Sequence, residues 1–104
     1  MKAFVVEKIG DKEFKSGIQE IITPKCEENE IVIKVTYSSL NYKDALSSVG
    51  NPGVTRNFPH VTGIDVAGTV YESTSSVFKV GERVLVTGYD MGMNTDGGHA
   101  QFVK

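Results

Sequence analysis

Residues 31–50 read IVIKVTYSSLNYKDALSSVG, and two periodicities follow one another within them. Over residues 31–38 one set of side chains alternates with a second set, and most are β-branched, which is typical of a strand. Asn41 then suits a helix N-cap, Asp44 follows three residues later, and a glycine ends the run. The stretch therefore predicts a strand and then a short helix near residues 42–48.

The remaining sequence carries further strand patterns. Residues 64–71 (IDVAGTVY) repeat the alternation, with Ile64, Val66 and Val70 on one face. Shorter strands are expected at 3–6, 18–22, 83–87 and 100–103, with irregular loops at 50–59 and 88–98. Several short strands and little helix predict a mainly β domain in the form of a barrel or a sandwich, because closure protects strand edges.

The composition fits one small globular domain. The chain has 104 residues, 39% of them hydrophobic, and a net charge of −2 from 11 basic and 13 acidic residues. This balance gives no reason to expect binding to nucleic acid or to a membrane surface. No apolar run approaches the roughly 20 residues of a spanning helix, and the charged start MKAFVVEKIGDKEF does not fit a signal peptide. We therefore expect a soluble, cytoplasmic protein.

The cysteine and the two histidines do not indicate a catalytic or metal-binding site. Cys26 is the single cysteine, so no internal disulfide can form, and its glutamate neighbours disfavour a reactive thiolate. The spacing of His60 and His99 suggests no metal cluster, so we interpret both as surface or loop residues. No GxGxxG motif occurs, and the GxxxxGGH spacing from Gly92 lacks the lysine of a phosphate loop. The residues themselves thus indicate neither a metal site nor a dinucleotide-binding fingerprint.

Two groups of polar residues are candidates for a site. Asn41, Tyr42 and Asp44 begin the predicted helix, where a structural role as cap is the alternative to a functional one. Asp65 lies inside a strand pattern, where aspartate is disfavoured unless it faces solvent or is paired. Arg56 lies in an irregular stretch and could either bind a phosphate or carboxylate or be a solvated loop charge.

Five segments carry a resemblance to a known family: MKAFVVE, SSLNYKDAL, RNFPHVTGIDVAGTV, FKVGERVLVTGYDMG and DGGHAQFV. In their order and spacing they resemble the N-terminal, GroES-like catalytic domain of the medium-chain dehydrogenase/reductase superfamily. SSLNYKDAL with RNFP and GIDVAGTV looks most like the YhdH/YhfP branch of quinone oxidoreductases, which includes acrylyl-CoA reductases. The resemblance covers residues 1–104 and implies a mainly β, GroES-like, partly open β-barrel with one or two short helices.

The resemblance implies an enzyme without zinc. Zinc alcohol dehydrogenases of this superfamily carry a catalytic cysteine near the helix start and a His-Glu pair in the motif GHE. Asn41 stands at the cysteine position here, and Ile64 and Asp65 replace the His-Glu pair. An amide and an alkyl side chain cannot replace a thiolate and an imidazole on zinc. The single cysteine also excludes a four-cysteine structural zinc site.

The resemblance further implies that the complete enzyme passes a hydride from NADPH to an activated C=C bond, in an enoyl thioester such as acrylyl-CoA or in a quinone. The implied cofactor-binding residues are Asn41, Tyr42, Asp44 and Asp65. Tyr42 and Asp44 are the implied catalytic residues, with Tyr42 as the proton donor, because a phenol stays protonated at neutral pH. Arg56 is the implied substrate-binding residue.

The domain organisation is also an expectation from the resemblance. A Rossmann domain holds most of the cofactor in this family, and it is expected to be absent from this chain. We therefore expect residues 1–104 to be a GroES-like fragment that has no turnover alone, taken from an enzyme that acts on a small molecule as a homodimer. The alternative is a free-standing β-barrel binding module, such as a ring-forming co-chaperonin-like protein.

Overall fold

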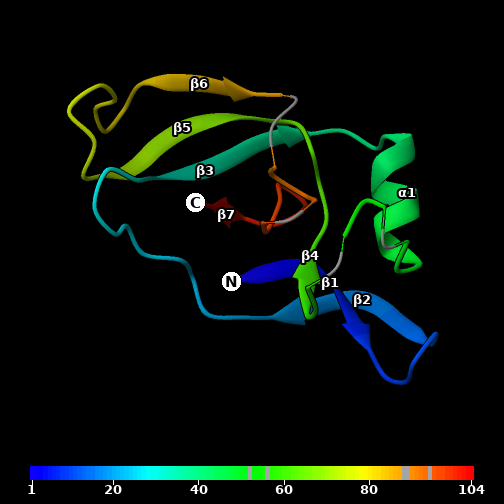
Figure 1. Ribbon diagram of the computed structural model, residues 1–104. Helices are drawn as coiled ribbons and strands as arrows, with labels where there is room; N and C mark the ends of the chain where they lie inside the picture. The colour runs from blue at the N-terminus through cyan, green and yellow to red at the C-terminus, as the bar shows by residue number, and fades with distance from the viewer. Residues whose placement is uncertain (52, 56, 88–89, 94) are drawn as a thin grey trace.

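The computed structural model describes residues 1–51, 53–55, 57–87, 90–93 and 95–104. Strands dominate this part of the chain, which contains one short α-helix (Figure 1). The elements are β1 (Lys2–Lys8), β2 (Phe14–Glu20), β3 (Ile31–Ser38), α1 (Tyr42–Ser48), β4 (His60–Val61), β5 (Val66–Ser73), β6 (Arg83–Val86) and β7 (Phe102–Val103). The predicted mainly β class is therefore confirmed.

The strands form two antiparallel sheets (Figure 1). One sheet has the order β2-β1-β4 and the other has the order β6-β5-β3-β7. The run that leads into β7 connects them, because the Phe4 N–H donates to the His99 carbonyl at 2.8 Å while the Val35 N–H donates to the Gln101 carbonyl at 2.9 Å. The sheets thus join along one edge without closing completely, which agrees with the predicted partly open barrel.

Two strands are displaced along the chain from their predicted positions. The strand expected at 18–22 begins earlier, as β2, because all seven residues of β1 pair with it. The strand expected from Ile64 begins at Val66 instead. The Ile64 N–H donates to the Asp44 carboxylate at 3.1 Å, so that backbone group is engaged by a side chain before β5 begins.

Register shifts break the simple alternation predicted for β3. The pairing of β3 with β5 shifts between Val32 and Ile33 and again between Val35 and Tyr37. Neighbouring residues of a regular strand face opposite sides, and a bulge changes that relation locally. Val32 and Ile33 are consequently both buried, with exposed fractions of 0% and 1%.

Two clusters of buried apolar side chains stabilise the sheets. The members of the first are Ile33, Val66, Met91 and Val103, and those of the second are Ala3, Val5 and Val61. Fully burying one valine or isoleucine side chain contributes about 1.5–3 kcal/mol relative to leaving it exposed. Val66 and Val70 are both buried, so β5 directs its apolar face inward as predicted.

Helix α1 spans the predicted residues and is fastened at both ends. At its start the Asn41 N–H donates to the Asp44 carboxylate at 2.9 Å, which satisfies one N-terminal donor. Near its end the buried hydroxyls of Ser47 and Thr55 share a hydrogen bond of 2.6 Å. In the part of the chain that the structure describes, no helix is long and apolar enough to cross a membrane.

Candidate functional site

Asp44 is a buried carboxylate at the start of α1, with only 3% of the residue exposed. Its Oδ2 accepts the Asn41 N–H at 2.9 Å, and its Oδ1 accepts the N–H groups of Gly63 and Ile64, each at 3.1 Å. Three backbone donors compensate the cost of burying a charged group. Asp44 therefore ties the helix to the segment before β5, which is a larger structural role than the predicted cap.

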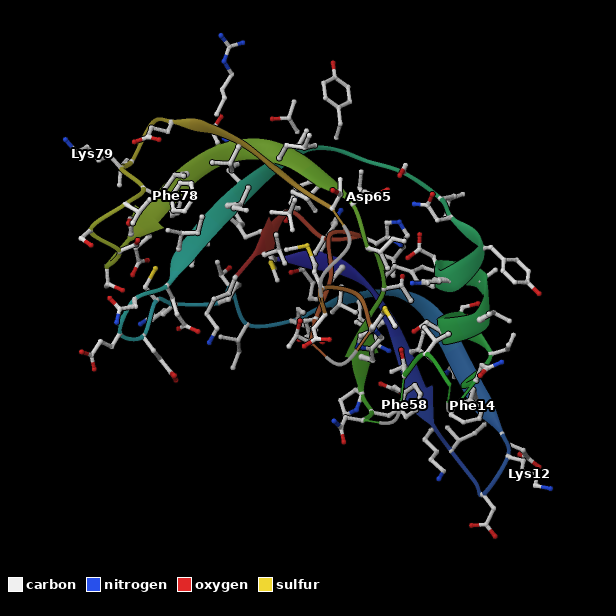
Figure 2. The ribbon with its side chains drawn as sticks, turned by 45° about the horizontal axis from the view of Figure 1, so that its top comes forward. Lys12, Phe14, Phe58, Asp65, Phe78 and Lys79 are labelled. Carbon is white, nitrogen blue, oxygen red and sulfur yellow. The ribbon has the colours of Figure 1, made fainter. Side chains whose placement is uncertain are left out.

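Asp65 lies at the end of the four-stranded sheet next to α1 (Figure 2), and Asn41 is its hydrogen-bonded neighbour. Asn41 Nδ2 donates to Asp65 Oδ2 at 3.1 Å and to Ser39 Oγ at 2.9 Å. Ser39 Oγ donates in turn to the same Asp65 oxygen at 3.2 Å. Asp65 is thus paired and half-buried, which explains why an aspartate is tolerated at the start of this strand.

His99 joins the same network. Its Nδ1 lies 2.7 Å from Thr62 Oγ1, and its Nε2 lies 2.9 Å from the Ser39 carbonyl oxygen. Nε2 is also 3.9 Å from Asp44 Oδ2, and only 15% of the His99 side chain is exposed. Neither Ser39 nor Thr62 was predicted from the sequence, and no spacing rule connects them to His99.

The prediction that both histidines are surface or loop residues is correct for His99, which lies in the loop before β7, and wrong for His60, which is buried in β4. The loop that leads into β7 folds back against β4, where the Gly97 N–H donates to the Val61 carbonyl at 2.8 Å. A Cβ on Gly97 would lie 2.3 Å from the Gly63 carbonyl oxygen, so only glycine permits this approach. His60, only 3% exposed, and His99 are enclosed by this folding back.

A cavity of about 440 Å³ opens beside the network. It is lined by Phe4, Leu40, Asn41, Asp44, Ala45, Ser48, Thr62 and His99. The side chains of Asp44, Thr62 and His99 already bond within the protein, whereas Phe4 and Leu40 present apolar surface. The cavity therefore suits a short apolar group that carries a polar end, the usual character of a small-molecule site.

Not every predicted site residue is among those that line this cavity in the described part of the chain. Tyr42 is 79% exposed on α1 and does not line the cavity, although its neighbour Asn41 does. The catalytic role expected for Tyr42 stays a prediction. Arg56 lies outside the described residues, so its expected contact with substrate also stays a prediction.

The residues at the positions compared with zinc ligands do not fit a zinc ion. Asn41 turns its Nδ2, a hydrogen-bond donor, toward Asp65, and Ile64 offers only an alkyl group. Among the described residues, no group of three or more His, Cys, Asp or Glu side chains could hold a metal ion. We assign no step of the chemistry to a metal at this site.

Cys26 does not line the cavity either. Its N–H donates to a Glu72 carboxylate oxygen at 3.4 Å. Burial, and next the Glu72 charge, raise the pKa of the Cys26 thiol above its usual value. A thiol whose pKa is raised is less often a thiolate, so the prediction that Cys26 is unreactive is confirmed.

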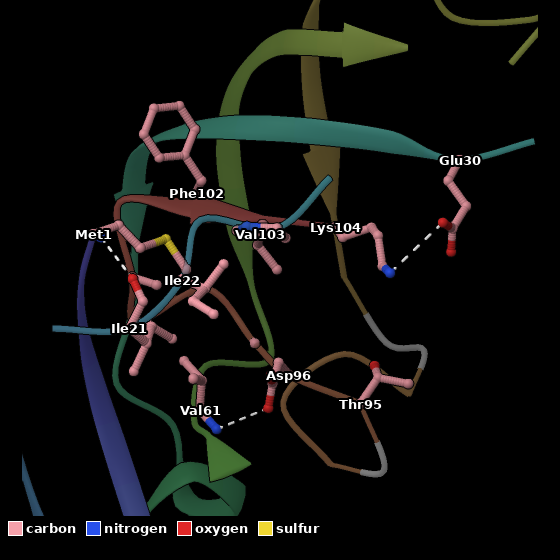
Figure 3. Close-up of a pocket in the computed structure, with 13 residues that line it drawn as sticks. Met1, Ile21, Ile22, Glu30, Val61, Thr95, Asp96, Phe102, Val103 and Lys104 are labelled. Carbon is pink, nitrogen blue, oxygen red and sulfur yellow. Dashed lines mark hydrogen bonds and ion pairs between the residues drawn. The ribbon is translucent and has the colours of Figure 1, made fainter. Parts of the chain in front are cut away.

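A second cavity, of about 300 Å³, lies beside β7 (Figure 3). Ile21, Ile22 and Val103 give it apolar surface. Lys104 Nζ and Glu30 Oε1, which both border it, lie 3.7 Å apart. Asn41, Asp44 and Asp65 do not line it. The cavity beside α1 is therefore the better candidate for chemistry.

The domain consists of two antiparallel sheets that join at one edge and of one short helix whose start borders a cavity. This architecture defines its class. Residues 27–104 match the alcohol dehydrogenase GroES-like domain, and the chain belongs to that family. The GroES-like fold that the sequence predicts is confirmed.

Individual relatives place the chain more closely. It is 41% identical over 101 residues to the Probable acrylyl-CoA reductase AcuI of Escherichia coli (strain K12), a match that covers 97% of this chain and 31% of that protein. Its structure is similar to that of the yhdH oxidoreductase from Salmonella enterica in complex with NADP, with a TM-score of 0.89 and 36% identity over 100% of this chain and 32% of that one. Bacillus subtilis yhfP with NAD bound gives a TM-score of 0.86 and 34% identity over 97% of this chain and 30% of that one.

These relatives confirm the predicted resemblance to the YhdH/YhfP branch. The chain spans about a third of the length of each relative named here.

Proposed function

We propose that this chain is the substrate-side domain of an NADPH-dependent, zinc-independent oxidoreductase that reduces activated C=C bonds, in enoyl thioesters such as acrylyl-CoA or in quinones. The observation that carries the proposal is the cavity beside the Asn41–Asp65 pair in a domain of this family. The relatives support it, since one is named as an acrylyl-CoA reductase and another is an oxidoreductase in complex with NADP.

The donor set beside the cavity fits a nicotinamide cofactor. Amide and carboxylate groups are suited to bind a carboxamide, and the apolar wall of Phe4 and Leu40 suits the face of a ring or an acyl chain. When bound, NADPH supplies the hydride that adds to the β-carbon of the alkene. Most of the NADPH would contact a Rossmann domain, which fits relatives about three times as long as this chain.

Within this proposal the chain's own residues bind and orient. Asn41 offers its amide to the ligand's polar end, and Asp65 fixes the orientation of that amide through the Nδ2 contact at 3.1 Å. Asp44 acts as a positioning residue rather than a reacting one, because backbone N–H groups occupy both of its carboxylate oxygens. Holding groups in place before reaction removes part of the entropic barrier.

Tyr42 is the proposed proton donor. After hydride addition the substrate is an enolate, and a proton at its α-carbon completes the reduction. The exposed phenol at the start of α1 is one residue from Asn41, so a ligand bound at the cavity mouth and covered by a second domain could contact it. Arg56 remains the proposed anchor for the anionic part of the substrate, on its place in the sequence alone.

The test uses the full-length protein that carries this sequence. NADPH oxidation is followed at 340 nm, the usual absorbance of reduced nicotinamide, with acrylyl-CoA, a longer enoyl thioester and a quinone as separate substrates. Reduction of a thioester or quinone with NADPH supports the proposal, and the ratio of kcat/KM values identifies the substrate class. The absence of turnover with all three refutes it. A ring-shaped oligomer in size-exclusion chromatography would then favour the co-chaperonin-like alternative.

A further inference from the structure

His99 is fixed through both nitrogens of its ring. The Ser39 carbonyl oxygen, 2.9 Å from Nε2, can only accept a hydrogen bond, so Nε2 must carry a proton. In the neutral ring Nδ1 then has no proton and accepts a hydrogen bond from the Thr62 hydroxyl, whose oxygen lies 2.7 Å away. The surrounding groups therefore select the Nε2–H tautomer and one ring orientation.

Through Ser39 the ring is linked to the candidate site. The Ser39 carbonyl receives the His99 bond, while the Ser39 hydroxyl contacts Asn41 Nδ2 at 2.9 Å and Asp65 Oδ2 at 3.2 Å. Ser39 is itself exposed and belongs neither to β3 nor to α1, so neither strand pairing nor helical bonds hold it. The His99 hydrogen bond therefore holds the backbone of Ser39, the residue whose hydroxyl contacts both Asn41 and Asp65.

We propose that His99 is a positioning residue of this site, which acts through Ser39 to hold the Asn41 amide at the cavity in a fixed orientation. The consequence for substrate binding rests on the proposed function. The consequence for the orientation of Asn41 does not.

The ring is not needed to hold its own loop in place. The His99 N–H donates to the Thr62 carbonyl at 2.9 Å, and the His99 carbonyl accepts the Phe4 N–H at 2.8 Å. These backbone bonds do not depend on the side chain and remain available in any variant other than proline. Loss of the ring should therefore leave β7 paired and release only the Ser39 carbonyl and the Thr62 hydroxyl.

Three variants of the full-length protein test the proposal. His99→Leu introduces a side chain that is similar in size to the ring but cannot form hydrogen bonds. His99→Gln keeps an N–H group that can reach the Ser39 carbonyl. His60→Gln is the matched control, because His60 Nε2 contacts the Gly92 carbonyl oxygen and does not line the cavity. With NADPH and an enoyl thioester, we expect His99→Leu to raise KM about tenfold with kcat within about threefold of wild type.

The proposal further requires that His99→Gln restores KM to within about threefold of the wild-type value and that His60→Gln leaves KM unchanged. The proposal is overturned if the KM of His99→Leu is within about threefold of the wild-type value. A His99→Gln variant no better than His99→Leu also overturns it, because a general loss of stability would affect both alike.

Nuclear magnetic resonance gives a readout that does not depend on enzymatic activity. The ¹⁵N shifts of the His99 ring should report the Nε2–H tautomer, and the Asn41 side-chain NH₂ signals should be resolved in the wild type and in His99→Gln. In His99→Leu those NH₂ signals should move to the positions of a solvent-exposed amide. An Nδ1–H tautomer, or Asn41 signals unchanged in His99→Leu, refutes the positioning role even if reduction is observed. Absence of reduction in the wild type, with these signals as expected, refutes only the proposed function.

Discussion

Replacing Asp44 with asparagine changes one oxygen of a buried carboxylate into an NH₂ group. Three backbone N–H groups donate to that carboxylate, at 2.9, 3.1 and 3.1 Å. An amide keeps one acceptor oxygen, so the bonds from Gly63 and Ile64 can survive as neutral ones, while the Asn41 N–H then faces another donor. An unmet buried donor costs about 1–3 kcal/mol, and the loss of charge weakens the two remaining bonds by about 1 kcal/mol in total. We therefore expect Asp44→Asn to lower the free energy of unfolding by about 3 kcal/mol.

Urea denaturation of this chain, followed by far-ultraviolet circular dichroism, measures that loss. Asp65→Asn is the matched control, because among the described residues the half-buried Asp65 side chain accepts only from the side chains of Ser39 and Asn41. It should cost about 1 kcal/mol. The reasoning is refuted if Asp44→Asn unfolds within about 0.5 kcal/mol of the wild type, the range typical of surface substitutions, or if the control costs as much.

Three further outcomes are expected. Tyr42→Phe removes only the hydroxyl, so in the full-length protein it should lower kcat for an enoyl thioester by about 10²- to 10⁴-fold, and a loss below about threefold would make solvent the better proton source. Residues 1–104 alone should bind NADPH more weakly than about 10 μM in a fluorescence titration, because they contain no glycine-rich phosphate-binding motif, and micromolar or tighter binding contradicts this. Elemental analysis after mild chelation should find less than about 0.1 zinc per chain, since Asn41 and Ile64 are poor ligands, and one zinc per chain contradicts it.

Local patterns in the sequence were sufficient for most of the fold. Helix α1 lies at the predicted residues, because its cap and its glycine stop are local signals. The start of β5 was predicted wrongly, because the Ile64 N–H donates to Asp44, a residue 20 positions away in the chain. The bulges of β3 were missed for a related reason, since register depends on the partner strand as well as on the strand itself.

The site was predicted only in part. Asn41 and Asp65 were singled out by their residue types, and the structure joins them at 3.1 Å across 24 positions of sequence. His99 was interpreted as a surface or loop residue because its spacing from His60 suggests no metal cluster, whereas in the structure its ring is bonded at both nitrogens. The sequence feature that could have drawn notice is the pair of glycines before it. Gly97 permits a backbone approach that no residue with a Cβ allows, and this approach brings His99 into contact with Thr62.

A network of hydrogen bonds stabilises the start of α1. The Asp44 carboxylate gathers backbone donors from two segments, and the Asn41 amide bridges to Asp65 at the end of the sheet. Zinc binds thiolate, imidazole and carboxylate groups, and at the positions compared with zinc ligands only Asp65 offers one, through an oxygen that already accepts hydrogen bonds from Asn41 and Ser39. These contacts also orient the Asn41 amide, which lies beside the apolar wall of the cavity. Under the proposed function, that amide would orient a polarised alkene for hydride addition.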